Sequence, residues 1–507
     1  LRDGSQGENI SFTLADKIRI AEKLDEFGIA FIEGGWPGSN PKDTEFFHRM
    51  ARQPLKNSQL VAFGSTRRKT HQPAKDPNLK ALIASGTEWV AIFGKSWDLH
   101  VREVLRTSLE ENLVLIEDSV AFLKEHGRKV IFDAEHFFDG YQHNPDYALK
   151  TLQAAERAGA VRIVLCDTNG GCLPEQISAG VQAARKSVAA ALGIHTHNDS
   201  GLSVANTIAA VKAGAVHVQG TMNGLGERCG NADLTAIIPI LQLKMGFQCV
   251  PESSLKQLTA LSRFVYEVAN MVPAGPQPFV GLSAFAHKGG IHVDAMSKNS
   301  RSYEHISPEK VGNQRRILIS ELSGKSTILQ KMKNYNLEKQ PELTRRLVEM
   351  VAELEKDGYQ FEAAEASFDL MVRKALGQYR QLFRVEGFRV IVEKRGNRVV
   401  SEATVKISVD GQVEHTASEG NGPVNALDNA LRKALIKFYP ELAGMRLTDY
   451  RVRILHAEKA TGAITRVLIE SADEKDTWGT IGLSENIIEA SWKALVDSFE
   501  FKLLKDR

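Results

Sequence analysis

The chain has 507 residues, 43% of them hydrophobic and 25% charged, an ordinary composition for a globular protein of two or three domains. Its formal net charge is only +2, so we expect no nucleic-acid partner. No run of 18 apolar residues occurs in the sequence, and we therefore expect no membrane span.

The cysteine content indicates a reducing environment. The four cysteines form no C-x-x-C pair and are too few for a disulfide framework in a chain of this length; they are Cys166, Cys172, Cys229 and Cys249. Reduced cysteines are typical of a cytoplasmic location, which we predict. The sequence opens at Leu1 in residues typical of a loop, and we expect a first strand to precede it.

Between residues 16 and about 245, amphipathic helices alternate with short apolar strands. The first helix is predicted at 16–27, where apolar residues recur at steps of three and Gly28 ends the pattern. Seven strands are predicted, at 29–35, 60–64, 89–94, 130–135, 162–167, 193–197 and 216–220. Continuous apolar strands separated by helices indicate a parallel sheet covered on both faces. With one more strand before Leu1, the pattern predicts a (β/α)8 TIM barrel.

The pattern changes after residue 272, where a Pro- and Gly-rich stretch begins. From 361 onward, strands and helices are predicted in two similar β-β-β-α halves, with strands at 388–392, 403–409, 452–455, 465–469 and 478–482 and helices at 423–438 and 485–499. We therefore predict a barrel at 1–272, helical linker subdomains at 273–360 and an α+β C-terminal domain at 361–507.

Polar residues gather at the C-terminal ends of the predicted strands, the rim at which such barrels carry their chemistry. His195 and His197 are two residues apart on one strand and therefore share a face, although such a pair alone is more often structural. Asp3, Glu135 and Asn231 follow other strand ends, with a buried ion pair as the alternative for Glu135. Together these side chains predict a divalent-metal site, with Mg²⁺ or Mn²⁺ favoured and Zn²⁺ also compatible.

Three segments resemble the family of 2-isopropylmalate, homocitrate and citramalate synthases: LRDGSQ at 1–6, HTHNDSGL at 195–202 and NGLGERCGN at 223–231. The likeness extends over the whole chain. It implies that the metal is held by Asp3, His195, His197 and Asn231. It also implies that Arg2 and Glu135 complete the catalytic set and that Thr168 contacts the carboxylate of a 2-oxo acid.

Beyond the barrel, GGIHVD at 289–294 matches a segment whose histidine, His292 here, acts on acetyl-CoA, often across a dimer. Tyr303 matches a tyrosine beside that histidine, and we expect Asp294 to support both. The resemblance further implies that residues 361–507 form a regulatory dimerisation domain that binds the end-product amino acid. A homodimer is therefore expected.

Within the family, the segments at 33–43 and 93–98 resemble the bacterial (R)-citramalate branch. The substrates would then be pyruvate and acetyl-CoA, joined by a Claisen-type condensation and thioester hydrolysis, and the effector would be isoleucine. This would be the first step of a threonine-independent route to isoleucine. Three alternatives stay open: a 2-isopropylmalate synthase acting on 2-oxoisovalerate, a metal-dependent lyase similar to 3-hydroxy-3-methylglutaryl-CoA lyase, and a non-catalytic sensor.

Overall fold

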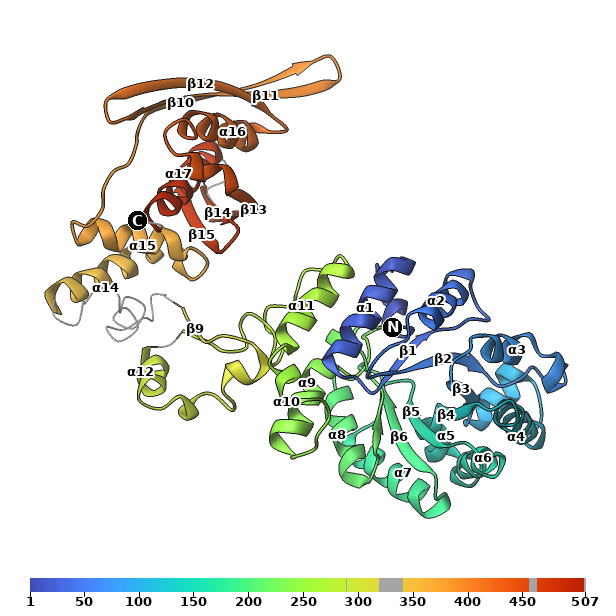
Figure 1. Ribbon diagram of the computed structural model, residues 1–507. Coiled ribbons are helices and arrows are strands. Elements are labelled where there is room, and N and C mark those ends of the chain that lie inside the picture. Colours follow the sequence, from blue (N-terminus) through green and yellow to red (C-terminus); the bar gives the residue numbers. More distant parts are fainter. Residues whose placement is uncertain (289, 319–340, 456–462, 506–507) are drawn as a thin grey trace. The chain divides into compact units, whose positions relative to one another are not determined.

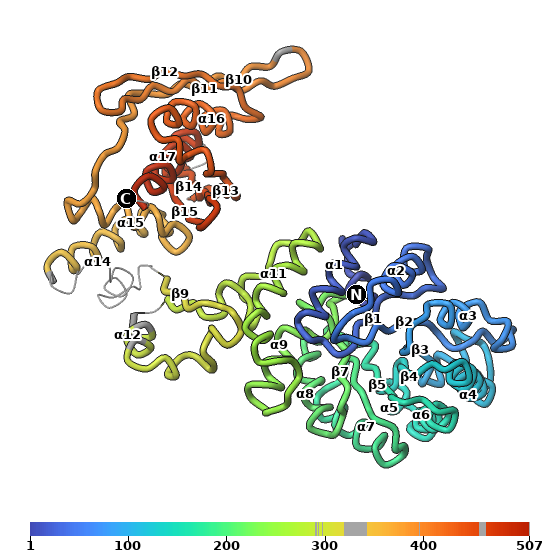
Figure 2. Tube along the Cα trace, viewed as in Figure 1, coloured from blue at the N-terminus to red at the C-terminus, as the bar shows by residue number. Residues whose placement is uncertain are grey.

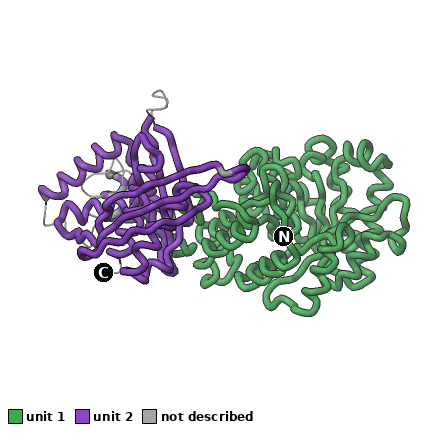
Figure 3. Tube along the Cα trace, turned by 90° about the horizontal axis from the view of Figure 1, so that it is seen from above, with its two compact units in different colours: residues 1–285, 306–314 green, residues 286–305, 315–507 purple. Residues whose placement is uncertain are grey.

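A computed structural model describes residues 1–288, 290–318, 341–455 and 463–505. The chain divides into two compact units, the first formed by 1–285 and 306–314 and the second by 286–305 and 315–507 (Figure 3). No helix in the described part of the chain has the length and apolar character needed to cross a membrane.

The first unit is built on seven parallel strands that pair in sequence order, β1 to β7 (Figure 1). Their bounds are β1 Phe31–Gly35, β2 Gln59–Ser65, β3 Trp89–Lys95, β4 Lys129–Glu135, β5 Arg162–Asp167, β6 Ala191–Thr196 and β7 His217–Val218. Each strand overlaps a predicted one, and the predicted barrel fold is confirmed. The eighth strand, expected before Leu1, stays a prediction.

Helices precede, separate and follow these strands, as the alternating pattern predicts. They are α1 Leu14–Phe27, α2 Pro41–Arg52, α3 Pro77–Ala84, α4 Leu109–Glu125, α5 Phe137–His143, α6 Pro145–Ala158, α7 Pro174–Ser187, α8 Ser203–Ala213, α9 Leu234–Pro239, α10 Glu252–Leu255 and α11 Leu258–Val268. Helix α1 begins two residues before the predicted start, because Thr13 and Asp16 form a reciprocal capping box. It ends at Gly28, whose φ of +93° few other residues adopt.

Alternation along the strands separates two faces of the sheet. In β4, Val130, Phe132 and Ala134 face the helices and join the main core. Ile131, on the opposite face, belongs to a smaller apolar cluster inside the barrel, made of Val61, Phe63, Trp89, Ala91, Ile131, Val164 and Cys166. Asp133 and Glu135 continue the inner face toward the C-terminal end of the strand. The barrel interior therefore changes from apolar to polar as it approaches the rim.

The second unit contains α12 Gly290–Lys298, α14 Pro341–Lys356 and α15 Glu365–Ala375, with a short sheet of β8 Ala286–His287 and β9 Arg316–Ile317. Two antiparallel three-stranded sheets follow, each completed by a helix (Figure 2). Their elements are β10 Arg384–Arg395, β11 Arg398–Val409, β12 Gln412–Gly420 and α16 Pro423–Leu435, then β13 Arg446–Leu455, β14 Ile464–Ala472, β15 Thr477–Ser484 and α17 Ile487–Lys505. This arrangement confirms the predicted pair of β-β-β-α halves. Both helices contribute to one apolar core.

Candidate metal centre

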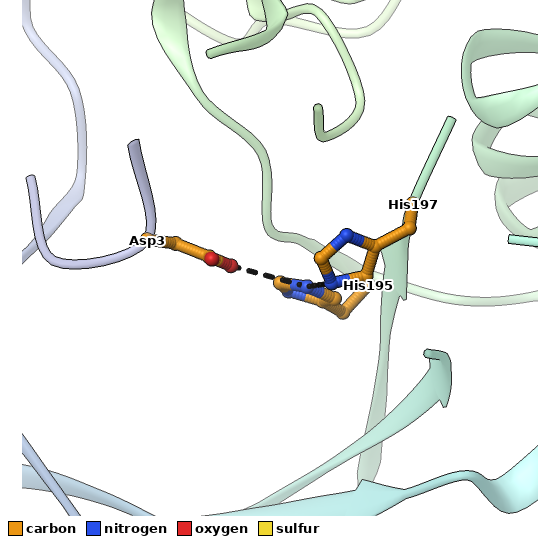
Figure 4. Close-up of side chains that lie close together, drawn as sticks. All are labelled: Asp3, His195 and His197. Carbon is orange, nitrogen blue, oxygen red and sulfur yellow. Dashed lines mark hydrogen bonds and ion pairs between the residues drawn. The ribbon is translucent and has the colours of Figure 1, made fainter. Parts of the chain in front are cut away.

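Asp3, His195 and His197 meet inside the first unit (Figure 4). One ligand atom of each lies within 4.8 Å of the other two. Nε2 of His195 is 3.3 Å from Oδ2 of Asp3 and 3.3 Å from Nε2 of His197. His195 lies in β6 and His197 directly follows its last residue, Thr196. The amide of Arg2 donates to the carbonyl of Glu33 in β1, which anchors Asp3 nearby.

Asn231 lies next to this cluster because its backbone forms an antiparallel bridge with His197. Its Nδ2 donates a 3.1 Å hydrogen bond to the carbonyl of Leu225, while Oδ1 is buried and finds no hydrogen-bond partner in the described part of the chain. The loop approaches so closely that a Cβ at Gly226 would overlap the carboxamide of Asn231. Gly226 is therefore required at this position, because a side chain there would clash with Asn231.

Burial and neighbouring charges shift the pKa values of Asp3 and His197 in the directions that favour cation binding. Burial alone would raise the pKa of Asp3, but Arg2 and His195 lower it to about 2. Burial, with the neighbouring His195, lowers the pKa of His197 to about 4. At neutral pH Asp3 is thus ionised and His197 neutral, the states in which both bind metals. One carboxylate, two imidazoles and the unpartnered amide oxygen of Asn231 fit a divalent cation.

Arg2 lies at the edge of the cluster and is tightly held. Its Nε donates a 2.7 Å hydrogen bond to Oε1 of Glu33, and NH1 donates one of 3.0 Å to Oε1 of Gln6. The guanidinium also covers the ring of Phe63, 3.7 Å from its centroid. An arginine fixed in this way is pre-organised to donate to an anionic group.

Glu135 forms an ion pair with Lys95, which is its register partner on β3. The structure thus contains the ion pair that the sequence left open as an alternative. Both side chains are partly exposed at the rim, so the pair does not exclude a role for the Glu135 carboxylate in proton transfer.

Thr168 follows β5, and its hydroxyl accepts a 2.9 Å hydrogen bond from the amide of His136. Its carbonyl accepts one of 2.7 Å from Arg228, whose guanidinium also binds both oxygens of Asp199 at 2.7 and 2.9 Å. Arg228 therefore joins the loops that follow three strands of the barrel.

His292, Asp294 and Tyr303 belong to the second unit, whereas the metal cluster belongs to the first. The rings of His292 and Tyr303 stack with centroids 4.3 Å apart, and both side chains are exposed. Asp294 pairs with Lys298 one turn along α12, at 2.8 Å. Gly289, which begins the matched segment, lies outside the described residues.

Sequence reasoning did not single out four polar residues whose contacts reach the predicted site. These are Glu33, Lys95, Asp133 and Gln219. The period of a strand provides a signal for one of them, since Asp133 is two residues before Glu135 and must share its inward face. No comparable signal ties Glu33 to Arg2, because that contact joins two separate segments.

Comparisons with known proteins cover nearly the whole chain. Residues 1–265 match the HMGL-like family, 279–358 the homocitrate synthase post-HMGL domain-like family, and 362–503 the LeuA allosteric (dimerisation) domain. The chain is 56% identical to an (R)-citramalate synthase of Geobacter sulfurreducens and 54% identical to one of Aquifex aeolicus, over 100% of its length and 96% and 97% of theirs. A probable 2-isopropylmalate synthase of Methanopyrus kandleri is 32% identical over 98% of this chain and 95% of its own length.

Proposed function

This chain belongs to the family of (R)-citramalate synthases, and from that premise we propose that it condenses acetyl-CoA with pyruvate to give (R)-citramalate and CoA. The observation that carries the proposal is the much higher identity to the (R)-citramalate synthases of Geobacter sulfurreducens and Aquifex aeolicus than to the 2-isopropylmalate synthase, over nearly full length. The match of residues 362–503 to the LeuA allosteric (dimerisation) domain favours a synthase over a simple lyase. The assembled metal cluster argues against a non-catalytic sensor.

Asp3, His195, His197 and Asn231 would hold a divalent metal ion, and we propose Mn²⁺ or Mg²⁺, with Zn²⁺ also compatible with these ligands. Bound there, the ion would supply Lewis-acid polarisation of the 2-oxo group. The support is the donor set itself and the buried, unpartnered amide oxygen of Asn231.

The protein's own side chains would perform the remaining chemistry. Arg2, held by Glu33, would donate hydrogen bonds to the oxygen on which negative charge develops. Thr168 would contact the carboxylate of pyruvate. His292, acting with Glu135 as the proton-transfer apparatus, would accept the proton that leaves the acetyl methyl group, with Tyr303 and Asp294 supporting it. The methyl carbon then bonds to C2 of pyruvate, and water hydrolyses the thioester to release CoA.

The C-terminal domain, of the LeuA allosteric dimerisation type, would make the enzyme an oligomer under allosteric control. We propose a homodimer with isoleucine as the effector, and hence a place in isoleucine biosynthesis. A cavity of about 450 Å³ between α16 and β13 supports this proposal, because it offers both charged and apolar groups to an amino acid. Its lining comprises Val424, Asn425, Asp428, Arg432, Met445, Arg446, Leu447 and Tyr450.

We also propose a cytoplasmic location and a division into domains at 272/273 and 360/361. The location is supported by the cysteines, all four of which are free thiols. The division is supported by the three successive family matches.

The test is an assay of the full chain with Mn²⁺ and acetyl-CoA, in which free CoA is followed with a thiol reagent. Pyruvate, 2-oxoisovalerate and 2-oxoglutarate are compared, and chiral chromatography identifies the product. We expect a strong preference for pyruvate and formation of (R)-citramalate. Preference for 2-oxoisovalerate would contradict the substrate, and no thiol release with any of the three acids would contradict the activity.

A further inference from the structure

Gln219 links His195 to a buried carboxyl group inside the barrel. Its backbone amide continues the β6–β7 ladder by donating to the carbonyl of Ile194 at 2.9 Å, which places the side chain beside His195. Oε1 of Gln219 lies 2.9 Å from Nδ1 of His195. Its Nε2 donates a 3.2 Å hydrogen bond to Oδ1 of Asp133, a residue that is only 4% exposed.

This arrangement fixes the protonation site of the imidazole. A carboxamide oxygen only accepts hydrogen bonds, so Nδ1 of His195 must carry a hydrogen in order to donate to it. The lone pair of the neutral ring then lies on Nε2, the atom that is 3.3 Å from both Asp3 and His197. His195 is thereby held in the tautomer that coordinates a metal through Nε2.

Asp133 determines which way the carboxamide of Gln219 faces. If the amide turned over, its NH2 group would face Nδ1 and favour the opposite tautomer of His195. Asp133 prevents this because it offers an acceptor oxygen to Nε2 of Gln219. Burial, together with the Glu33 carboxylate, raises the pKa of Asp133 well above its usual range, yet a neutral carboxyl group retains its carbonyl oxygen as an acceptor. The acceptor for Nε2 of Gln219 is therefore present in either state.

We propose that Gln219 and Asp133 are positioning residues that hold His195 in the tautomer able to bind the catalytic metal ion. The proposal rests on the proposed metal site and adds the residues that make its central ligand competent. Neither residue was assigned a role from the sequence or from the family resemblance.

The test measures Mn²⁺ affinity directly. Gln219→Met keeps the approximate size of the side chain and removes both polar atoms, and Asp133→Leu removes the acceptor. Partners of metal-ligating histidines contribute about 10–100-fold to metal affinity, so each variant should raise the dissociation constant for Mn²⁺ by that factor in titration calorimetry. Gln153→Met is the matched control, because Gln153 donates to Ser187 between α6 and α7, at 2.9 Å, away from the metal cluster.

Exchanging the carboxyl group of Asp133 and the carboxamide of Gln219 distinguishes a positioning role from a contribution to packing alone. In the double variant Asp133→Asn with Gln219→Glu, the asparagine amide donates to one glutamate oxygen while the other accepts from Nδ1 of His195. Mn²⁺ affinity should return to within a few-fold of wild type, with the thermal unfolding of the metal-free protein as the folding control. Wild-type affinity in Gln219→Met, or a double variant that folds but stays weak, would overturn the proposal. A wild-type chain that binds no Mn²⁺ would overturn the metal ligands and the positioning role together.

Discussion

Nε of Arg2 donates a 2.7 Å hydrogen bond to Oε1 of Glu33, a contact between the loop that precedes α1 and the strand β1. The bond fixes the guanidinium beside the metal cluster, where NH1 lies 3.5 Å from Oδ1 of Asp3. Hydrogen bonds between charged groups are stronger than neutral ones, and both partners here are largely buried. Glu33 therefore fixes the position from which the Arg2 guanidinium can donate hydrogen bonds to a bound substrate.

Glu33→Ala should lower kcat for citramalate formation by roughly 10- to 100-fold, because hydrogen bonds to charged groups contribute about 1.5–3 kcal/mol. The arginine would still be present but would no longer be held in one orientation. Mn²⁺ affinity should change much less than kcat, since Glu33 is not a proposed ligand. Glu26→Ala, at a side chain that is 65% exposed, is the control. A kcat within twofold of wild type would refute the orienting role of Glu33.

Gly226→Ala should weaken Mn²⁺ binding about tenfold or more. A Cβ at this position would overlap Nδ2 of Asn231, 2.0 Å away, and would displace the carboxamide that we propose as a metal ligand. The control is Gly246→Ala, where φ is +78° and a Cβ would meet no atom within 4 Å. That change should reduce stability by about 1 kcal/mol through backbone strain and leave Mn²⁺ affinity unaltered. Equal affinities in the two variants would argue against Asn231 as a ligand.

The fold was largely predictable from the sequence because local patterns determine it. Apolar runs, helical periodicity and the ending glycine at Gly28 identified all seven strands of β1 to β7 and the first helix. The two histidines were predicted to share a face from their spacing alone, and the strand-end position of Glu135 placed it at the rim. These inferences need only the geometry of one element and the rule that parallel strands end at one edge.

Contacts between separate segments could not be predicted in this way. The pairs Arg2–Glu33 and Lys95–Glu135 depend on which rotamers meet across strands, and the sequence left the Lys95 contact only as an unspecified ion pair. The role of Gln219 is visible only once β6 and β7 are side by side.

Val424→Trp should abolish the inhibition by isoleucine that we propose. Val424 lines the cavity between α16 and β13, and an indole there would occupy the space proposed for the effector. Thiol release is measured over a range of isoleucine concentrations, with each variant normalised to its own uninhibited rate. Val413→Trp, at a side chain of β12 that is 53% exposed, provides the control and should retain inhibition. Inhibition that persists in Val424→Trp with unchanged midpoint would place the effector elsewhere.

Asp497→Asn should stabilise the protein at pH 7 and have little effect at pH 4. Burial raises the pKa of Asp497 to about 6, even though its Oδ2 accepts a 2.6 Å hydrogen bond from Ser367. The unfolded chain loses this proton near pH 4, so between pH 4 and 6 the folded protein binds more protons. The free energy of unfolding therefore falls as pH rises through this window. Asparagine keeps an acceptor for Ser367 without ionising, and should add roughly 1–2 kcal/mol at pH 7.

Asp473→Asn should destabilise the protein at neutral pH, whereas Asp497→Asn should stabilise it. Asp473→Asn is therefore the control for the link between carboxyl ionisation and stability. Despite burial, Lys502 at 2.7 Å and Lys505 at 2.8 Å lower the pKa of Asp473, so its ionised form stabilises the fold at neutral pH. That contribution is present above the unfolded pKa and is lost as pH falls through the folded pKa. Calorimetric unfolding at pH 4 and pH 7 should thus show Asp497→Asn gaining more stability at the higher pH. Asp473→Asn should lose stability by nearly the same amount at both pH values, because the lowered pKa of Asp473 lies well below this window. A gain for Asp497→Asn that is the same at both pH values would mean that packing, and not ionisation of the buried carboxyl, is responsible.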